Sequence, residues 1–228
     1  MGGPVTGPPD PSRWRDPHPA LADTPLPMIE FAPGAVEFFQ CYRHVPNPPP
    51  NMQNRGPLSF NPFASGRFNA PAKQFGTTYL SMSIRGAFVE TVVQNAALLP
   101  PGTGSLLGSA ITQQEIDYRQ IVRIELVSGR LCLVDFTAEG LVQAGTDNQL
   151  CSCHVENRGR TQRWALALHD HPDKPDGIIY RARHDPACIS LAVFDRAENR
   201  LRAVRSINYL GRPEVLAELV TLYNVALM

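Results

Sequence analysis

The segment CISLAVFDR, residues 188–196, constrains the fold most, because its apolar residues continue on both alternating faces of a strand. A strand that is apolar on both faces lies inside a sheet rather than at its solvent-exposed edge. The segment QIVRIELVSG, residues 120–129, alternates instead, and Val122, Ile124 and Leu126 form its apolar face. These two segments predict a sheet with a central, fully buried strand and at least one half-buried strand.

Further segments predict a small number of short strands and helices. Segment 84–99 has an apolar stripe at helical spacing, as does 212–228, which carries Pro213 near its start. Segment 34–45 predicts a short helix that runs into a strand. Strands are also expected at 76–83, 130–137, 176–185 and 199–208, and a further helix at 161–171. The fold class is therefore α+β, with a compact mixed β-sheet core and flanking helices.

Proline divides the chain into two regions. The chain has 22 Pro, which crowd its first half, and residues 1–35 combine many of them with little periodicity. This composition predicts a Pro-rich N-terminal extension that is extended or poorly ordered. Residues 36–228 are predicted to form one domain, since this length can bury one sizeable core.

Charge, hydropathy and cysteine content narrow the functional class. Lys and Arg together number 21, as do Asp and Glu, so the formal net charge is zero. Proteins that bind nucleic acid directly usually carry a surplus of basic residues, which this chain lacks. No run approaches 18 apolar residues, which argues against a membrane span. The five Cys form no even disulfide framework, so we expect a reduced, cytoplasmic protein.

No metal or nucleotide motif is convincing. Cys151, Cys153 and His154 lie close together, and His169 and His171 form an H-x-H pair, but neither group has the four-ligand spacing of a structural zinc site. We therefore expect no metal. The chain also lacks G-x-G-x-x-G, G-x-x-x-x-G-K-[ST] and G-x-S-x-G, which leaves dinucleotide-fold enzymes, P-loop NTPases and serine hydrolases without support.

The phrase SGRFNAP, residues 65–71, holds Arg67 and Asn69 on a turn of small residues. Tyr79 follows twelve residues after Arg67, and Glu90 eleven residues after Tyr79. Taken singly, they are a loop arginine, a strand aromatic residue and a solvated helical glutamate. Periodicity alone gives no reason to unite them.

Together these residues resemble the RES domain family, named for an Arg, a Glu and a Ser. The resemblance runs over roughly residues 36–210, through CYRHV (41–45), SGRFNAP (65–71), FGTTYLS (75–81) and GAFVET (86–91). Members are bacterial toxins of toxin–antitoxin pairs that destroy NAD, and their fold is similar to that of ADP-ribosyltransferase toxins.

The resemblance implies catalytic roles for Arg67, Tyr79 and Glu90. A carboxylate such as Glu90 stabilises the positive charge that develops on the ribose when the nicotinamide bond breaks. Arg67 or Arg43 is suited to the diphosphate, because a guanidinium binds phosphate with two donors. Tyr79 is expected to stack on the nicotinamide or a ribose.

Three further positions are expected at the substrate, and one departs from the family. Asn69 either pins the turn or contacts substrate, and Tyr180 is a substrate-binding candidate. The family serine falls at Ala182, which has no hydroxyl. Whether this alanine is natural or engineered is left open by the sequence.

The resemblance thus implies a toxin that cleaves NAD⁺, with NAD as substrate rather than cofactor, and with water, phosphate or a protein as acceptor. The alternatives are a protein ADP-ribosyltransferase and, because of Ala182, a catalytically impaired protein that binds NAD or a partner. A cognate antitoxin is the expected partner, and a homodimer is one option for the oligomeric state.

Overall fold

The computed structural model of the chain describes residues 15–48, 56–98 and 109–228. Its strands are β1 (Met28–Phe31), β2 (Phe38–Arg43), β3 (Thr77–Ser81), β4 (Ala97–Leu98), β5 (Ser109–Ile111), β6 (Arg119–Leu126), β7 (Leu131–Phe136), β8 (Gly177–Arg181), β9 (Ile189–Phe194), β10 (Leu201–Val204) and β11 (Val225–Leu227). Its α-helices are α1 (Ile84–Thr91), α2 (Gln113–Asp117), α3 (Gly140–Gln143), α4 (Gln149–Ser152), α5 (Arg158–Asp170) and α6 (Pro213–Leu222). Its 3-10 helices are η1 (Pro19–Asp23), η2 (Val93–Asn95), η3 (Val155–Asn157) and η4 (Asp195–Arg200).

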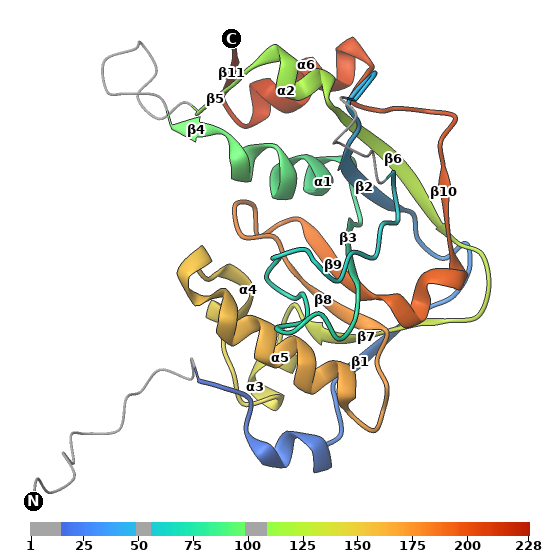
Figure 1. Cartoon of the computed structure of the whole chain (residues 1–228), viewed down its shortest axis with the longest axis vertical. Coiled ribbons are helices and arrows are strands. Elements are labelled where there is room, and N and C mark those ends of the chain that lie inside the picture. Colours follow the sequence, from blue (N-terminus) through green and yellow to red (C-terminus); the bar gives the residue numbers. More distant parts are fainter. Residues whose placement is uncertain (1–14, 49–55, 99–108) are drawn as a thin grey trace, which may run out of the picture.

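Eight strands form one mixed sheet in the order β1-β7-β8-β9-β3-β2-β6-β10 (Figure 1). Only β7 and β8 run parallel, and the other neighbours in this sheet are antiparallel. Strand β9 lies inside the sheet between β8 and β3, which confirms the prediction made from its two apolar faces. The α+β class is also confirmed.

The sheet is strongly curled, and one of its faces closes on itself. A single apolar cluster takes residues from all eight strands, among them Leu80, Ile124, Leu133, Leu191 and Val193. Phe31 of the edge strand β1 meets Phe38 of β2 edge to face, with ring centroids 5.7 Å apart, although four strands separate β1 from β2 in the sheet. Such curling follows from the right-handed twist of the strands.

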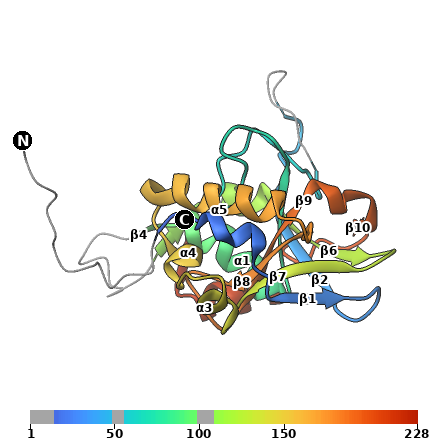
Figure 2. The ribbon, with the colours of Figure 1, turned by 90° about the horizontal axis from the view of Figure 1, so that it is seen from below.

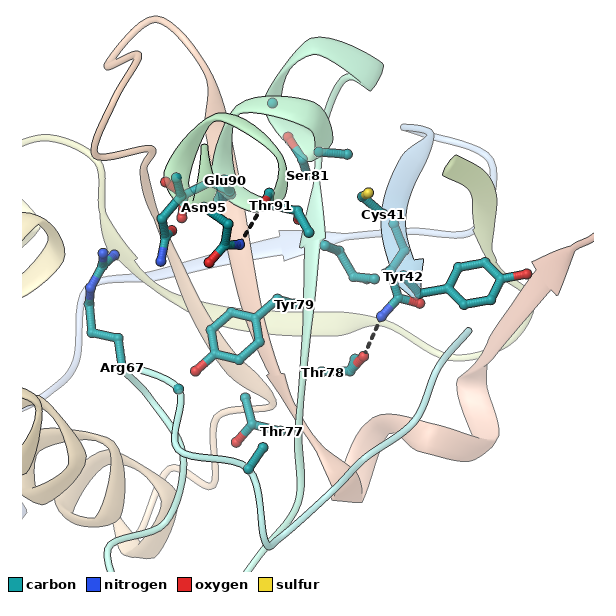
Figure 3. A pocket seen from close by; sticks show the side chains of 18 of the residues that line it. Cys41, Tyr42, Arg67, Thr77, Thr78, Tyr79, Ser81, Glu90, Thr91 and Asn95 are labelled. Carbon is teal, nitrogen blue, oxygen red and sulfur yellow. Dashed lines mark hydrogen bonds between the residues drawn. The ribbon is translucent and has the colours of Figure 1, made fainter. Parts of the chain in front are cut away.

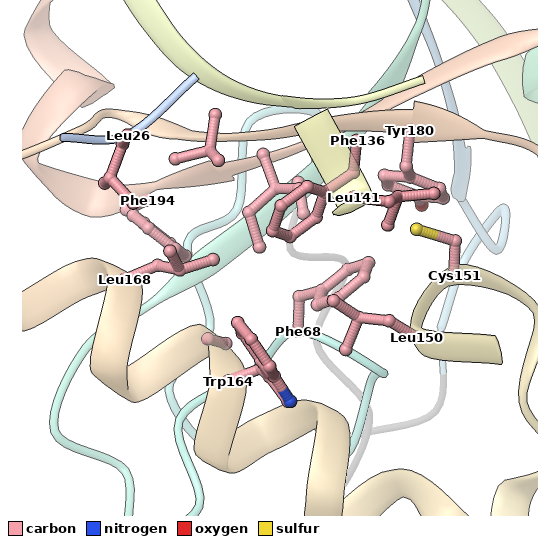
Figure 4. Close-up of a cluster of buried hydrophobic side chains, with 14 of the residues drawn as sticks. Leu26, Phe68, Phe136, Leu141, Leu150, Cys151, Trp164, Leu168, Tyr180 and Phe194 are labelled. Atoms are coloured by element: carbon pink, nitrogen blue, oxygen red, sulfur yellow. The ribbon is translucent and has the colours of Figure 1, made fainter. Parts of the chain in front are cut away.

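Helices α1 and α5 cover the opposite face of the sheet. Trp164 and Leu168 of α5 pack against Phe136 and Phe194 of the sheet, as Figure 4 shows. Ala87 and Phe88 of α1 belong to a second cluster with Phe39 of β2. The two helices thus lie over different strands, α5 over the β7–β9 side and α1 over the β2 side.

The N-terminal segment is part of this core from residue 15 onward. Strand β1 pairs with β7, and Leu21 and Leu26 are buried with Trp164. The indole Nε1 of Trp164 donates a hydrogen bond of 2.9 Å to the carbonyl of Arg15. Figures 1 and 2 show this segment, in blue, beside α5 before it joins the sheet.

The expectation that residues 1–35 are extended or poorly ordered is therefore wrong for residues 15–35, because several of their apolar side chains are buried in the hydrophobic core. Residues 1–14 lie outside the described residues. The division of the chain at residue 35 stays a prediction. No helix among the described residues is long and apolar enough to cross a membrane.

Three predicted helices differ from the structure. The helix expected at 84–99 ends at Thr91, because Ala97–Leu98 leaves to pair with β5. The helix expected at 212–228 ends at Leu222, because Val225–Leu227 pairs in parallel with β5. The segment 34–45 contains β2 and no helix. In the first two cases a strand partner distant in sequence overrides the local helical pattern.

We expect Leu21→Ala to lower the free energy of unfolding by about 2 kcal/mol or more, because it opens a cavity in the core. Urea denaturation followed by circular dichroism measures this change. Leu222→Ala, at a half-exposed position on α6, is the matched control and should cost about 0.5 kcal/mol or less. Equal effects of the two substitutions would show that the N-terminal segment does not belong to the core.

Candidate active site

A cavity of about 900 Å³ lies beside α1 on the helix-covered face of the sheet. Arg67, Tyr79 and Glu90 all line it, and Figure 3 shows their side chains facing one hollow. Tyr180 and Arg43 also line the cavity. The fold thus brings together a loop, three strands and a helix that are well separated in sequence.

Glu90 is held by hydrogen bonds to both of its carboxylate oxygens. The hydroxyl of Tyr180 donates to Oε2 at 3.3 Å, and the backbone N–H of Arg183 donates to Oε1 at 2.9 Å. Two donors on opposite oxygens fix the plane of the carboxylate. Glu90 is therefore an oriented carboxylate at the cavity and not a solvated surface residue.

The helix that carries Glu90 is tied to the same loop that carries Arg183. Ser83 caps the N-terminus of α1 by accepting a bond from the N–H of Gly86. Arg85 Nε then donates to Asp185 Oδ2 at 2.8 Å, and the hydroxyl of Tyr223 donates to the same oxygen at 2.6 Å. These bonds set the height of α1 above the end of β8.

The turn that carries Arg67 is held by helix α5. Three consecutive carbonyls of the turn, those of residues 65, 66 and 67, accept bonds from α5. Arg158 Nη1 donates to the first at 3.1 Å, Gln162 Nε2 to the second at 3.2 Å, and Thr161 Oγ1 to the third at 2.6 Å. Arg67 is consequently presented to the cavity by a rigid turn.

Tyr79 supports this turn from the other side. Its hydroxyl accepts a hydrogen bond of 2.9 Å from the N–H of Phe68 and donates one of 3.0 Å to Asn69 Oδ1. Burial raises the pKa of Tyr79 well above its ordinary value, so the phenol stays neutral. An added Cβ at Gly66 would lie 2.4 Å from the Tyr79 oxygen, so only glycine permits this close approach.

Asn69 acts within the turn. It is fully buried, and its amide nitrogen donates to the carbonyl of Asn61 at 3.3 Å while its amide oxygen accepts from Tyr79. Its side chain is not among those that line the cavity. Of the two roles that the sequence left open, the structure thus shows that Asn69 pins the turn, and a substrate contact stays a prediction.

Arg67 and Tyr180 form a charged and aromatic wall next to Glu90. The Arg67 guanidinium lies 5.9 Å from the centroid of the Tyr180 ring. Burial acts to lower the pKa of Arg67, but its interactions with Tyr180 and Glu90 outweigh this, and the pKa is raised. Burial, with Glu90 as the next cause, raises the pKa of Tyr180 well above its ordinary value, so its hydroxyl remains a donor.

Further cationic groups, not assigned from the sequence, line the cavity near Arg67. Arg158 and Arg183 belong to the wall, and Arg183 Nη1 donates to the carbonyl of Cys153 at 3.2 Å while its Nη2 lies 3.3 Å from the ring of His154. No local pattern signals these residues, because their positions depend on where α5 and the end of β8 come together. Arg43, in contrast, is engaged by Glu115 at 3.1 Å.

Ala182 is packed behind the site. It is buried against Val89 and Cys188 and is not among the residues that line the cavity. Its N–H donates to the carbonyl of Cys188 at 2.9 Å. The two residues that hold Glu90, Tyr180 and Arg183, lie on either side of it in the sequence.

Two thiols near the cavity, those of Cys41 and Cys151, are unreactive. Burial raises the pKa of Cys41, on the cavity wall, to about 12, and that of Cys151 also to about 12. Both are therefore neutral thiols rather than nucleophilic thiolates at neutral pH. Within the described parts of the chain, no three His, Cys, Asp or Glu side chains gather as a metal site requires.

Comparison with known proteins identifies relatives of this arrangement. The model of the family described as "RES domain" matches residues 40–213. A crystal structure of the M. tuberculosis MbcT–MbcA toxin–antitoxin complex contains a chain similar in fold, with a TM-score of 0.51 and 16% identity. The match covers 85% of this chain and 92% of that one. No curated protein matches the sequence.

We expect Tyr79→Phe to lower the free energy of unfolding by about 1–3 kcal/mol, because it leaves the buried N–H of Phe68 without its acceptor. Urea denaturation measures the loss. Tyr118→Phe, which removes only a solvent-exposed bond to Gln114, is the control and should change stability by about 0.5 kcal/mol or less. An unchanged stability of Tyr79→Phe would show that the hydroxyl does not hold the turn.

Proposed function

The chain belongs to the RES domain family, and we propose on that premise that it is a toxin which cleaves NAD⁺ at the bond between nicotinamide and ribose. The observation that carries this proposal is the doubly hydrogen-bonded Glu90 carboxylate facing the same cavity as Arg67. NAD is the substrate in this proposal and no resident cofactor is required.

In this proposal the Glu90 carboxylate acts at the ribose, and the arginines bind the diphosphate. Departure of nicotinamide leaves an oxocarbenium-like ribose, and a fixed carboxylate such as Glu90 stabilises that charge more than it stabilises the substrate. Arg67, Arg158 and Arg183 offer guanidinium groups to the diphosphate, which suits their bidentate geometry. Tyr79 and Tyr180 give the ring and ribose aromatic surfaces.

The acceptor is the open part of the reaction. Attack by water gives nicotinamide, ADP-ribose and a proton, whereas attack by phosphate gives nicotinamide and a phosphorylated ADP-ribose. Transfer to a protein would make the chain an ADP-ribosyltransferase, and label from the adenine of NAD would then remain on protein. The three products are separated by chromatography of the reaction mixture.

A cognate antitoxin is part of the proposal, because the fold neighbour was crystallised as a toxin–antitoxin complex. A toxin that depletes NAD acts where the cellular pool is, so we propose a cytoplasmic site of action. A homodimer stays a prediction.

Ala182 bears on whether this chain turns NAD over. Because its side chain packs against Val89 and Cys188 and not on the cavity wall, we expect cleavage with alanine in place. Cleavage that appears only in Ala182→Ser would instead identify the chain as a catalytically impaired NAD-binding protein.

We expect Glu90→Gln to reduce nicotinamide release from NAD by about a hundredfold or more, since it removes the charge that stabilises the transition state. Initial rates followed by chromatography test this. Glu125→Gln, which changes a carboxylate bound by Arg202 in the sheet, is the matched control and should retain full activity. Absence of nicotinamide release from both the unsubstituted protein and Ala182→Ser, with folding intact, would refute the proposed reaction.

A further inference from the structure

Ser190 lines the cavity, and its buried hydroxyl has no hydrogen-bond partner among the described residues. Only 2% of the residue is exposed. Its neighbours differ in this respect. Ser81 Oγ donates to the carbonyl of Ile189 at 2.8 Å, and Thr77 Oγ1 donates to the carbonyl of Phe68 at 3.1 Å. An unpaired buried hydroxyl is costly, so its retention calls for an explanation.

The sheet register places Ser190 close to the carboxylate. Ser190 of β9 is paired with Ser81 of β3 on one side and with Tyr180 of β8 on the other. Directly paired residues extend their side chains to the same face of a sheet, about 5 Å apart. Tyr180 bonds to Glu90 of α1, and Ser81 lies directly beneath Gly86 of the same helix. Ser190 therefore lies on the sheet floor below α1, between these two anchor points.

The guanidinium groups around the cavity come from other elements than the floor at Ser190. Arg67, Arg158 and Arg183, from the turn, α5 and the end of β8, contribute guanidinium groups that form no ion pair with a carboxylate among the described residues. The floor around Ser190 has no described cation among its paired neighbours, which are a serine and a tyrosine. A neutral polar group matches such a floor, whereas a phosphate does not.

We propose that the Ser190 hydroxyl binds the carboxamide of the nicotinamide ring, and so makes Ser190 a determinant of specificity for the leaving group. This inference rests on the proposed function. The bond to be broken must lie at Glu90, and the diphosphate lies toward the arginines, so the nicotinamide extends to the side of Glu90 away from them. The carboxamide is the polar substituent of that ring, and a serine hydroxyl can donate to its oxygen or accept from its nitrogen.

The experiment compares two ligands in a background that does not consume NAD. Titration calorimetry in Glu90→Gln measures the affinity for NAD, which carries the ring, and for ADP-ribose, which lacks it. Adding Ser190→Ala should weaken NAD binding by about three- to tenfold, the equivalent of one ordinary hydrogen bond. Binding of ADP-ribose should change by less than about twofold, because no carboxamide is lost.

Thr146→Val in the same background is the matched control. Thr146 is another fully buried residue whose hydroxyl has no described partner, but it does not line the cavity. Both substitutions remove an unpaired hydroxyl, so both should leave thermal stability unchanged or raised, whereas only Ser190→Ala should weaken NAD binding.

The outcomes separate the two levels of the proposal. Unchanged NAD affinity in Ser190→Ala, or an equal loss for NAD and ADP-ribose, would overturn the assignment of Ser190 while leaving NAD binding intact. A lowered thermal stability of Ser190→Ala would also overturn it, because the hydroxyl would then have a structural partner. Failure of Glu90→Gln itself to bind NAD, with nicotinamide release absent in the unsubstituted protein, would overturn the proposed function.

Discussion

Two hydrogen bonds to the Glu90 carboxylate join the helix α1 to the end of strand β8, and the geometry of the cavity depends on them. A carboxylate on one turn of a short helix is ordinarily free to rotate into solvent. Here the Tyr180 hydroxyl and the Arg183 N–H hold it, and the contact between Arg85 and Asp185 stops α1 from sliding along the sheet. The carboxylate is therefore positioned by the sheet as much as by its own helix.

The turn at residues 65–69 is the counterpart on the other side of the cavity. Its carbonyls are bound by α5 and its N–H at Phe68 by Tyr79, so the segment is enclosed by a helix and a strand. Tyr79 therefore has a structural role in addition to any stacking role, because its hydroxyl forms hydrogen bonds with the turn. These bonds hold Arg67, a loop residue, as rigidly as a residue on a helix or a strand.

Residue 182 is the position that the resemblance to the family assigns to the serine. Residue 182 lies between the two residues that hold Glu90, yet its side chain faces Val89 and Cys188. The contact that this position makes here is a backbone hydrogen bond, from its N–H to the carbonyl of Cys188. Ser190, on the neighbouring strand, lines the cavity instead.

The sequence by itself determined the α+β class and the central position of β9, because strand patterns are local, whereas the grouping of Arg67, Tyr79 and Glu90 came from the resemblance to the RES domain family. Only the tertiary structure decided that residues 15–35 complete the core, that the helices at 84–99 and 212–228 stop early, that Arg183 bonds to Glu90 and that Ser190 lines the same cavity. Each of these depends on a partner far away in sequence. Local propensity does not predict contacts with such a partner. Hydrogen bonds between strands and the burial of apolar side chains arise only once the sheet has formed.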